Sequence, residues 1–147
     1  MQPRRYWKAP DMNPNHRIGP HTSPQPSKLP ATSAEDFERL ASVLTVLAEL
    51  AHERMTVRQA LFFTSAAYLE AMGQTSSVPI IRDAVPVLKR AGEKIKETLL
   101  APTDRYPDAL GWLEQETDPN DRRMRYLKLS GEGREIALAL TDALHLR

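Results

Sequence analysis

The chain of 147 residues contains no cysteine. Disulfides, thiolate metal sites and thiol-based redox switches are therefore excluded, and we expect a reducing, cytoplasmic location. No apolar run approaches the roughly 20 residues that are needed to cross a bilayer. No apolar signal core follows the basic residues at the N-terminus. We therefore expect neither a membrane anchor nor export.

Signatures of catalysis and of cofactor binding are missing as well. The four histidines, at positions 16, 21, 52 and 145, are too scattered for a metal site or a nucleophile–base pair. There is no Gly-x-Ser-x-Gly elbow, and no glycine-rich phosphate loop follows a strand-like run. From these features we expect no enzymatic activity, no metal and no cofactor.

Proline and positive charge are concentrated at the N-terminus. Residues 1–32 hold seven of the twelve prolines, and five basic residues against one acidic residue give this segment a net charge of +4. Such a proline density prevents regular structure, so we expect a disordered, proline-rich, basic arm over 1–32. Its cluster Arg4-Arg5-Tyr6-Trp7-Lys8 is suited to contact along a DNA backbone, whereas a soluble leader without specific contacts is the simpler alternative.

Residues 33–147 have the apolar spacing of one helix-rich domain. Ser33 is a good N-cap for an amphipathic helix, and Thr56 to Gln59 has the capping-box pattern that opens a second helix. Gly73 predicts the end of that second helix. The expected helices, apart from the segment 87–100, span 33 to about 52, 57 to about 72, Thr75–Ser77 to Pro86, and 131 to about 145.

The start of the helix within 87–100 depends on which residue forms the preceding turn. Pro86 and Gly92 both compete for that role. We prefer a helix that begins near Glu93, because Gly92 supplies a natural break and proline is a poor residue in a helix interior. After this helix, residues 101–108 are expected to form a loop.

The segment 87–100 also offers donors for phosphates and base edges of DNA. Lys94 and Thr98 lie four residues apart and so share a helix face, and Lys96 is expected to be exposed. The alternative is an ordinary solvated face, since Glu93 and Glu97 neutralise part of the charge. The candidate DNA-binding residues of this segment are Lys89, Arg90, Lys94, Lys96 and Thr98.

A β-hairpin is expected after the loop. Strand-like runs at 111–116 and 123–129 flank a turn seeded by Asp118, Pro119, Asn120 and Asp121. Paired arginines near a hairpin tip suit the minor groove of DNA, where a narrow A/T-rich stretch concentrates negative potential. The candidate DNA-binding residues of the hairpin are Arg122, Arg123 and Arg125. The alternative is that Glu114, Glu116 and Asp118 pair with these arginines across the hairpin and only hold it together.

The segment Leu110–Gly133 resembles the wing of winged helix-turn-helix proteins of the MarR family. The resemblance is close over roughly two dozen residues and looser elsewhere, and the loop over 101–110 departs from the family pattern. It implies that one arginine of the pair contacts the minor groove, while Asp121 orients the loop or pairs with a basic partner. The matching residues are Asp118, Pro119, Asp121, Arg122, Arg123, Leu129, Ser130 and Gly133.

Together with this resemblance, the element order predicts a mainly α fold with a small β-hairpin, namely a winged helix-turn-helix domain over 33–147 with a dimerisation helix at each end. We expect a homodimeric transcriptional regulator that binds duplex DNA, a repressor with its recognition helix in the major groove and its wing in the minor groove. Helices 34–52 and 131–145 would form the dimer interface, through Phe37, Leu40, Leu44, Leu47, Ile136, Leu140 and Leu144.

The sequence names no effector molecule, and its charge balance supports a second function beside DNA binding. Many members of the family sense small aromatic or lipophilic molecules, but this sequence identifies no effector. Residues 33–147 hold 15 basic and 18 acidic residues, a net charge of −3. The ordered part is therefore not generally basic, and the alternative function is a winged-helix protein–protein interaction module without DNA readout.

Overall fold

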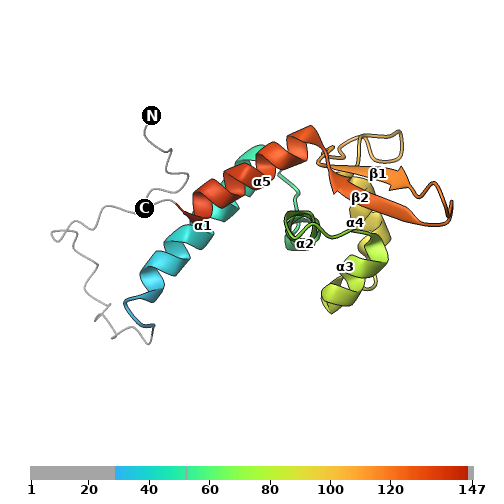
Figure 1. The fold of residues 1–147 in the computed structure, drawn as a ribbon. Coiled ribbons are helices and arrows are strands. Elements are labelled where there is room, and N and C mark those ends of the chain that lie inside the picture. Colours follow the sequence, from blue (N-terminus) through green and yellow to red (C-terminus); the bar gives the residue numbers. More distant parts are fainter. Residues whose placement is uncertain (1–28, 52, 146–147) are drawn as a thin grey trace.

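The computed structural model describes residues 29–51 and 53–145. The predicted arm over 1–32 lies outside these residues except for 29–32, as do His52 and the last two residues. The described chain is mainly helical, with five α-helices, one short 3-10 helix and a two-stranded antiparallel sheet. The two halves of the molecule are the antiparallel pair of helices α1 and α5, and a lobe of helix α2, the short helices after it and the hairpin (Figure 1).

The long helices α1 (Ser33–Leu50) and α5 (Gly131–Leu144) run side by side in opposite directions (Figure 1). α1 begins where the sequence predicts, but its N-cap is Thr32, whose side chain makes no capping hydrogen bond. Each helix buries one face against the other, because its apolar residues recur at three- and four-residue steps. The buried side chains of this helix pair are Ser42, Val46 and Leu47 from α1 and Ile136, Leu140 and Ala143 from α5.

Helix α2 (Val57–Ala71) has the predicted capping box. The Thr56 backbone N–H donates to the Gln59 side chain at 2.7 Å, and the Gln59 backbone N–H donates to the Thr56 hydroxyl at 3.1 Å. The helix is followed by Gly73 with φ +69°, a left-handed conformation that favours glycine. Both the start and the end of this helix are therefore confirmed.

Two short helices follow, and the turn that precedes the second of them covers residues 89–91. α3 (Val78–Ala84) leads into the 3-10 helix η1 (Pro86–Leu88), and α4 (Gly92–Leu99) begins after a further turn. The predicted helix start near Glu93 is thus confirmed within one residue, although Gly92 is the first residue of α4 and not the break before it. A Cβ on Gly92 would lie 2.9 Å from Cδ of Arg82 and 3.1 Å from Cγ1 of Val78, so α3 and α4 pack closely here because the position has no side chain.

The hairpin consists of β1 (Leu113–Thr117) and β2 (Arg125–Leu129), paired antiparallel from Leu113 opposite Leu129 to Thr117 opposite Arg125. It lies where the sequence predicts, with a longer connecting loop over 118–124. The segment before α3 also pairs with β2, since Leu127 N–H donates to the Ser76 carbonyl at 2.8 Å. This bridge fixes the hairpin beside α3.

The core of the short-helix lobe lies between the hairpin and α2. The ring of Trp112 is fully buried and meets Phe63 edge to face, with ring centroids 5.0 Å apart. Such aromatic pairs contribute about 0.5–1.5 kcal/mol beyond the area they bury. This contact joins the residue before β1 to α2.

Candidate nucleic-acid interface

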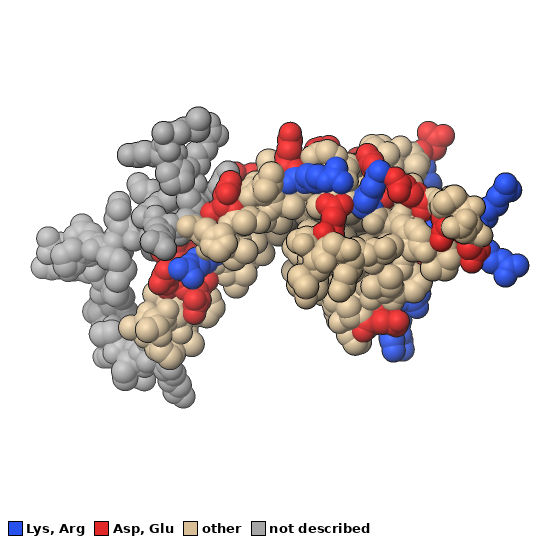
Figure 2. All heavy atoms as spheres, in the orientation of Figure 1, with Lys and Arg blue, Asp and Glu red and all other residues tan. Residues whose placement is uncertain are grey.

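The loop of the hairpin carries exposed arginines. Arg122, Arg123 and Arg125 are all exposed, and none of them forms an ion pair within residues 29–51 and 53–145. Basic side chains project from the end of the molecule where this loop lies (Figure 2). These guanidinium groups keep their donors available for an external acceptor.

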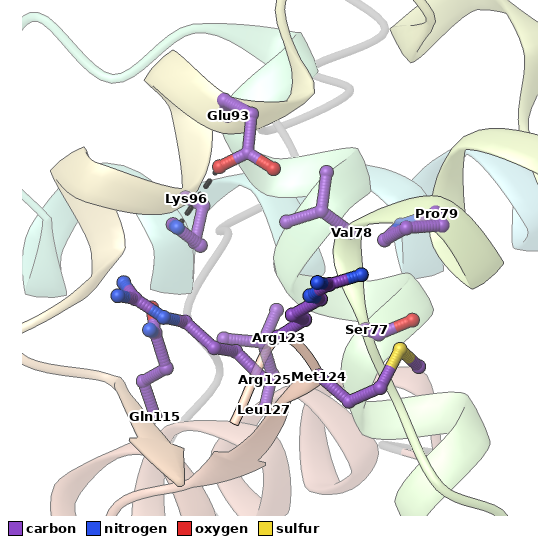
Figure 3. Close-up of a pocket in the computed structure, with 10 residues that line it drawn as sticks. All are labelled: Ser77, Val78, Pro79, Glu93, Lys96, Gln115, Arg123, Met124, Arg125 and Leu127. Atoms are coloured by element: carbon purple, nitrogen blue, oxygen red, sulfur yellow. Dashed lines mark hydrogen bonds and ion pairs between the residues drawn. The ribbon is translucent and has the colours of Figure 1, made fainter. Parts of the chain in front are cut away.

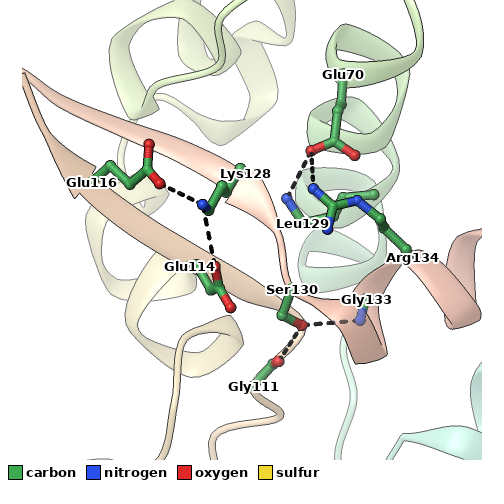
Figure 4. Close-up of polar contacts among 9 residues, drawn as sticks. All are labelled: Glu70, Gly111, Glu114, Glu116, Lys128, Leu129, Ser130, Gly133 and Arg134. Atoms are coloured by element: carbon green, nitrogen blue, oxygen red, sulfur yellow. Dashed lines mark hydrogen bonds and ion pairs between the residues drawn. The ribbon is translucent and has the colours of Figure 1, made fainter.

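The carboxylates of the hairpin have other partners, so the alternative in which they neutralise the arginines does not hold. Glu116 and Glu114 both pair with Lys128, the latter at 3.6 Å (Figure 4). The pKa of Lys128 is raised above its usual 10.5, chiefly by its hydrogen bond to Glu116. Asp118 accepts a hydrogen bond from the Tyr126 hydroxyl at 3.1 Å. The carboxylates that stabilise the hairpin are therefore not partners of the exposed arginines.

Two aspartates shape the loop itself. The carboxylate of Asp118 accepts the backbone N–H of Asn120 at 2.8 Å, and that of Asp121 accepts the backbone N–H of Arg123 at 3.0 Å. Asp121 also accepts the Met124 N–H on its carbonyl at 2.9 Å. Its carboxylate thus acts on the loop backbone rather than on a basic side chain, and it sets the direction in which Arg123 leaves the loop.

The predicted contacts on α4 need two corrections. Lys94 is exposed as expected, but Lys96 is only 7% exposed, and its ammonium group contacts Glu93 at 2.9 Å and Glu97 at 3.4 Å. The prediction of an exposed Lys96 is wrong because the side chain folds along the inner side of the helix, toward the hairpin. Its charge is largely matched by the two carboxylates.

Thr98 does not offer its hydroxyl to the outside. The hydroxyl donates to the Ile95 carbonyl at 2.6 Å and accepts a hydrogen bond from Nε2 of Gln59 at 3.0 Å. Thr98 therefore does not extend the exposed face of Lys94. Its hydroxyl instead links α4 to α2 through Gln59. Thr98 is therefore not a free donor on the outer face of α4, as the prediction for this residue requires.

Lys89 and Arg90 are exposed, but they lie in the turn between η1 and α4 and not on a helix. The structure thus separates the five predicted residues of the segment 87–100 into three groups: one exposed lysine on α4, two basic residues in the preceding turn, and two residues that face inward.

A groove of about 300 Å³ lies between the first turn of α3, α4 and the hairpin (Figure 3). Arg123 and Arg125 enter it from the hairpin, and Lys96 with its partner Glu93 enters from α4. The groove joins the hairpin arginines to α4, two elements that the sequence could only place near each other by resemblance. Three of its charged groups are cations and one is an anion, so it favours an anionic ligand.

The predicted dimer residues divide into two sets. Phe37, Leu40, Leu44 and Leu144 are between 46% and 53% exposed, whereas Leu47, Ile136 and Leu140 are each 7% exposed. The last three are used in packing α1 against α5 of the same chain and are not available to a partner, so their assignment to the interface is corrected. Two further leucines of these helices are exposed, Leu50 on α1 and Leu138 on α5.

A cleft of about 620 Å³ with a mostly apolar lining lies between α2 and α5. Its walls include Tyr68, Leu138 and Leu144, which are among the exposed large apolar residues. At one end, the Glu70 carboxylate accepts the Leu129 backbone N–H at 3.1 Å and contacts Arg134 at 3.4 Å (Figure 4). These contacts tie α2 to the hairpin and to α5.

Comparison of the chain with protein-family models, with curated proteins and with solved structures finds no match. Among the described residues, no group of His, Cys, Asp and Glu side chains could hold a metal ion, and no helix is long and apolar enough to cross a membrane.

Proposed function

We propose that this protein is a winged helix-turn-helix transcriptional regulator that binds duplex DNA as a homodimer and represses by occluding a promoter. The observation that carries the proposal is the hairpin loop, where Arg122 and Arg123 are exposed and have no ion-pair partner in the described chain, beside a cationic groove that ends on α4. Free guanidinium groups on a rigid hairpin are suited to phosphates and to the minor groove.

The arrangement of the elements supports the winged-helix part of the proposal. α3 and α4 follow α2 at short distances in the chain, and the hairpin follows α4. The bridge between Ser76 and Leu127 adds the segment before α3 to the edge of the hairpin. In a winged helix-turn-helix domain, the second helix of the motif and the hairpin loop reach the same stretch of duplex, and here α4 and the loop 118–124 would do so.

Each element has a distinct task in this mode of binding. α4 would enter the major groove with Lys94 on its exposed face, and the loop would place Arg122 in the adjacent minor groove. Arg123 and Arg125, which line the groove beside Lys96, would hold the intervening phosphate. Lys89 and Arg90, in the turn before α4, would contact the backbone. Asp121 keeps the loop in the conformation that this mode requires.

The exposed apolar face of α1 and α5 supports the homodimer. Phe37, Leu40 and Leu44 recur along one side of α1, and Leu144 lies at the end of α5. Monomeric proteins rarely leave such a row of large apolar side chains in water, and a second copy would cover it. A two-fold dimer predicts an inverted-repeat operator with half-sites about 34 Å apart, one helical turn of DNA.

Fluorescence anisotropy across a salt series tests this proposal. The protein is titrated onto duplexes from its own upstream region, beside the double variant Arg122→Ala/Arg123→Ala and the control Arg58→Ala, at an exposed residue of α2 outside both proposed interfaces. We expect the hairpin variant to bind more weakly, with a salt slope reduced by about 1, because the phosphate contact of Arg123 is lost together with the minor-groove contact of Arg122. The control should bind like the wild type.

Equal, weak binding of wild type and hairpin variant on every duplex would refute the proposal. In that case the exposed arginines face a protein, and the interaction module becomes the better explanation. A partner that copurifies with the wild type and is lost with the hairpin variant would then identify that function.

A further inference from the structure

The loop between α4 and β1, residues 101–110, is closed and anchored to α4. Thr103 and Tyr106 exchange two backbone hydrogen bonds of 3.1 Å each, and the Thr103 hydroxyl also accepts from the Tyr106 N–H. At the base of the loop, Leu110 N–H donates to the Thr98 carbonyl at 3.0 Å, and Gly111 N–H donates to the Leu100 carbonyl at 3.0 Å. The loop tip is therefore held in a defined position relative to α4.

Two side chains of this loop, Arg105 and Tyr106, form a cation–π pair. The guanidinium carbon of Arg105 lies 5.7 Å from the centre of the Tyr106 ring, and Tyr106 is half-buried while Arg105 is exposed. Arg105 forms no ion pair with any described residue. This cation–π contact restricts where the guanidinium group lies and leaves its N–H donors free.

The Arg105–Tyr106 pair lies beside the exposed face of α4. Arg105 and Tyr106 line a cleft of about 340 Å³ together with Glu93, Lys94 and Glu97 of α4. Glu93 also lines the groove that holds the hairpin arginines. The exposed face of α4 is thus bordered on one side by the hairpin and on the other by the loop 101–110, which lies next to β1 (Figure 1).

The cleft presents charges of both signs. Lys94 and Arg105 are cations, and Glu93 and Glu97 are anions. Glu93 and Glu97 also contact Lys96, and both stay partly exposed, so the cleft offers acceptors beside the donors of Lys94 and Arg105 and suits a base edge, which presents both. An arginine fork pairs with O6 and N7 of guanine in the major groove, which is the commonest specific contact between proteins and DNA.

We infer that the loop 101–110 is a second sequence-reading element, in which Arg105, oriented by Tyr106, binds a guanine in the major groove next to the base pairs covered by α4. The inference rests on the proposed DNA-binding function. It makes Arg105 a determinant of sequence specificity, and Tyr106 a positioning residue that acts through it. α4 by itself has one free lysine on its exposed face, Lys94, so the loop supplies a bidentate group that the helix lacks.

Selection from a random duplex library tests this inference. The wild type, Arg105→Ala, Tyr106→Leu and the hairpin variant Arg122→Ala/Arg123→Ala are each used to select bound duplexes. Affinities for the wild-type consensus are then measured across a salt series. We expect the wild type to select a fixed G·C pair in each half-site. Arg105→Ala should lose that preference and bind the consensus about tenfold more weakly, with an unchanged salt slope.

Tyr106→Leu should weaken the preference at the same base pair without changing the rest of the consensus, because Arg105 remains but is no longer oriented. Arg105 is exposed, so Arg105→Ala should keep the wild-type melting temperature, and its result does not depend on whether Tyr106→Leu folds.

Failure of this inference and failure of the proposed function give different results. If Arg105→Ala selects the same consensus as the wild type, the loop does not read sequence and the inference is overturned while the DNA-binding function stands. If its preference is unchanged but its salt slope falls by about 1, Arg105 contacts a phosphate, which also overturns the inference. If the wild type selects no sequence at all and binds like the hairpin variant, the proposed function itself fails.

Discussion

The backbone of Gly133 passes so close to Trp112 that a Cβ at position 133 would lie 2.0 Å from the carbonyl oxygen of Trp112. The same carbonyl accepts the backbone N–H of Ser130 at 3.0 Å. The first turn of α5 therefore packs directly against the backbone of Trp112, the residue before β1. This contact gives a physical reason for the spacing Leu-Ser-x-x-Gly over 129–133, since only glycine leaves room at the last position.

The first prediction follows from this contact. Gly133→Ala should lower the free energy of unfolding by about 3 kcal/mol or more, because the backbone of α5 or of Trp112 must move to relieve the overlap. Gly131→Ala is the matched control, since a Cβ at Gly131 meets nothing within 4 Å. Urea unfolding followed by circular dichroism measures both variants. Equal stabilities of the two variants would show that the contact with Trp112 is not as close as described.

The second prediction concerns the Ser130 hydroxyl, which caps α5. It accepts the Gly133 N–H at 3.0 Å and donates to the Gly111 carbonyl at 2.6 Å (Figure 4). Ser130→Ala should cost about 1–2 kcal/mol, because a helix cap is lost and a carbonyl beside the hairpin loses its donor. Ser130→Thr keeps the hydroxyl and should lose less than half as much. Thermal unfolding compares them, and a threonine variant as unstable as the alanine variant would contradict the capping role.

The third prediction tests the buried position of Lys96. Its aliphatic stem packs between α4 and the hairpin, so Lys96→Ala should lose about 1–2 kcal/mol, whereas Lys96→Met, which keeps a stem of similar length, should lose less than about 1 kcal/mol. The exposed Lys94 serves as the control, and Lys94→Ala should change stability by no more than about 0.5 kcal/mol. If alanine at both positions has the same small effect in urea unfolding, Lys96 is a surface residue.

The fourth prediction is a loss of stability at high pH. The hydrogen bond to Asp118 raises the pKa of Tyr126 above its usual 10.0, and Glu116 raises the pKa of Lys128 above 10.5. The folded state therefore holds both protons more tightly than the unfolded chain does. The resulting stability is fully present below the ordinary pKa values and is lost as the pH rises through the raised ones.

The variant Tyr126→Phe/Lys128→Gln isolates these two groups from other alkaline titrations. The wild type should melt at a higher temperature than the variant at about pH 9, and this difference should shrink as the pH rises above about 10. A difference that stays constant over this range would mean that neither hydrogen-bonded pair contributes stability through its proton.

The features that sequence reasoning located correctly have local causes. The capping box at Thr56 and Gln59, the stop at Gly73 and the helix start near Glu93 are each encoded within a few residues, and the structure has them, the last within one residue. The burial of Lys96 could not be predicted in this way. It depends on the hairpin, about 30 residues further along the chain, which closes over one side of α4.

The difference between local signals and contacts with distant residues also explains why only some of the predicted dimer residues are exposed. Spacing identifies an apolar stripe on a helix, but it does not say whether the stripe faces the same chain or a second copy. Leu47 and Ile136 belong to the stripe and are buried between α1 and α5 of one chain, while Leu40 and Leu44 belong to it and are exposed. The cleft at Arg105 and Tyr106 was missed because the spacing within the loop 101–110 carries no signal of its contact with α4.

The exposed part of that stripe supplies the last prediction. Leu40→Glu/Leu44→Glu should convert a dimer of about twice 16.6 kDa into a monomer, because burying two carboxylates in an apolar interface without partners costs several kcal/mol. Val87→Glu, at an apolar residue that is 57% exposed on η1, controls for the added charge and should leave the dimer intact. Light scattering over a range of concentrations measures the mass. The variant should bind a single half-site as the wild type does but lose affinity for the inverted repeat, since only a dimer engages both half-sites. A wild type that is monomeric at every concentration would contradict the proposed homodimer.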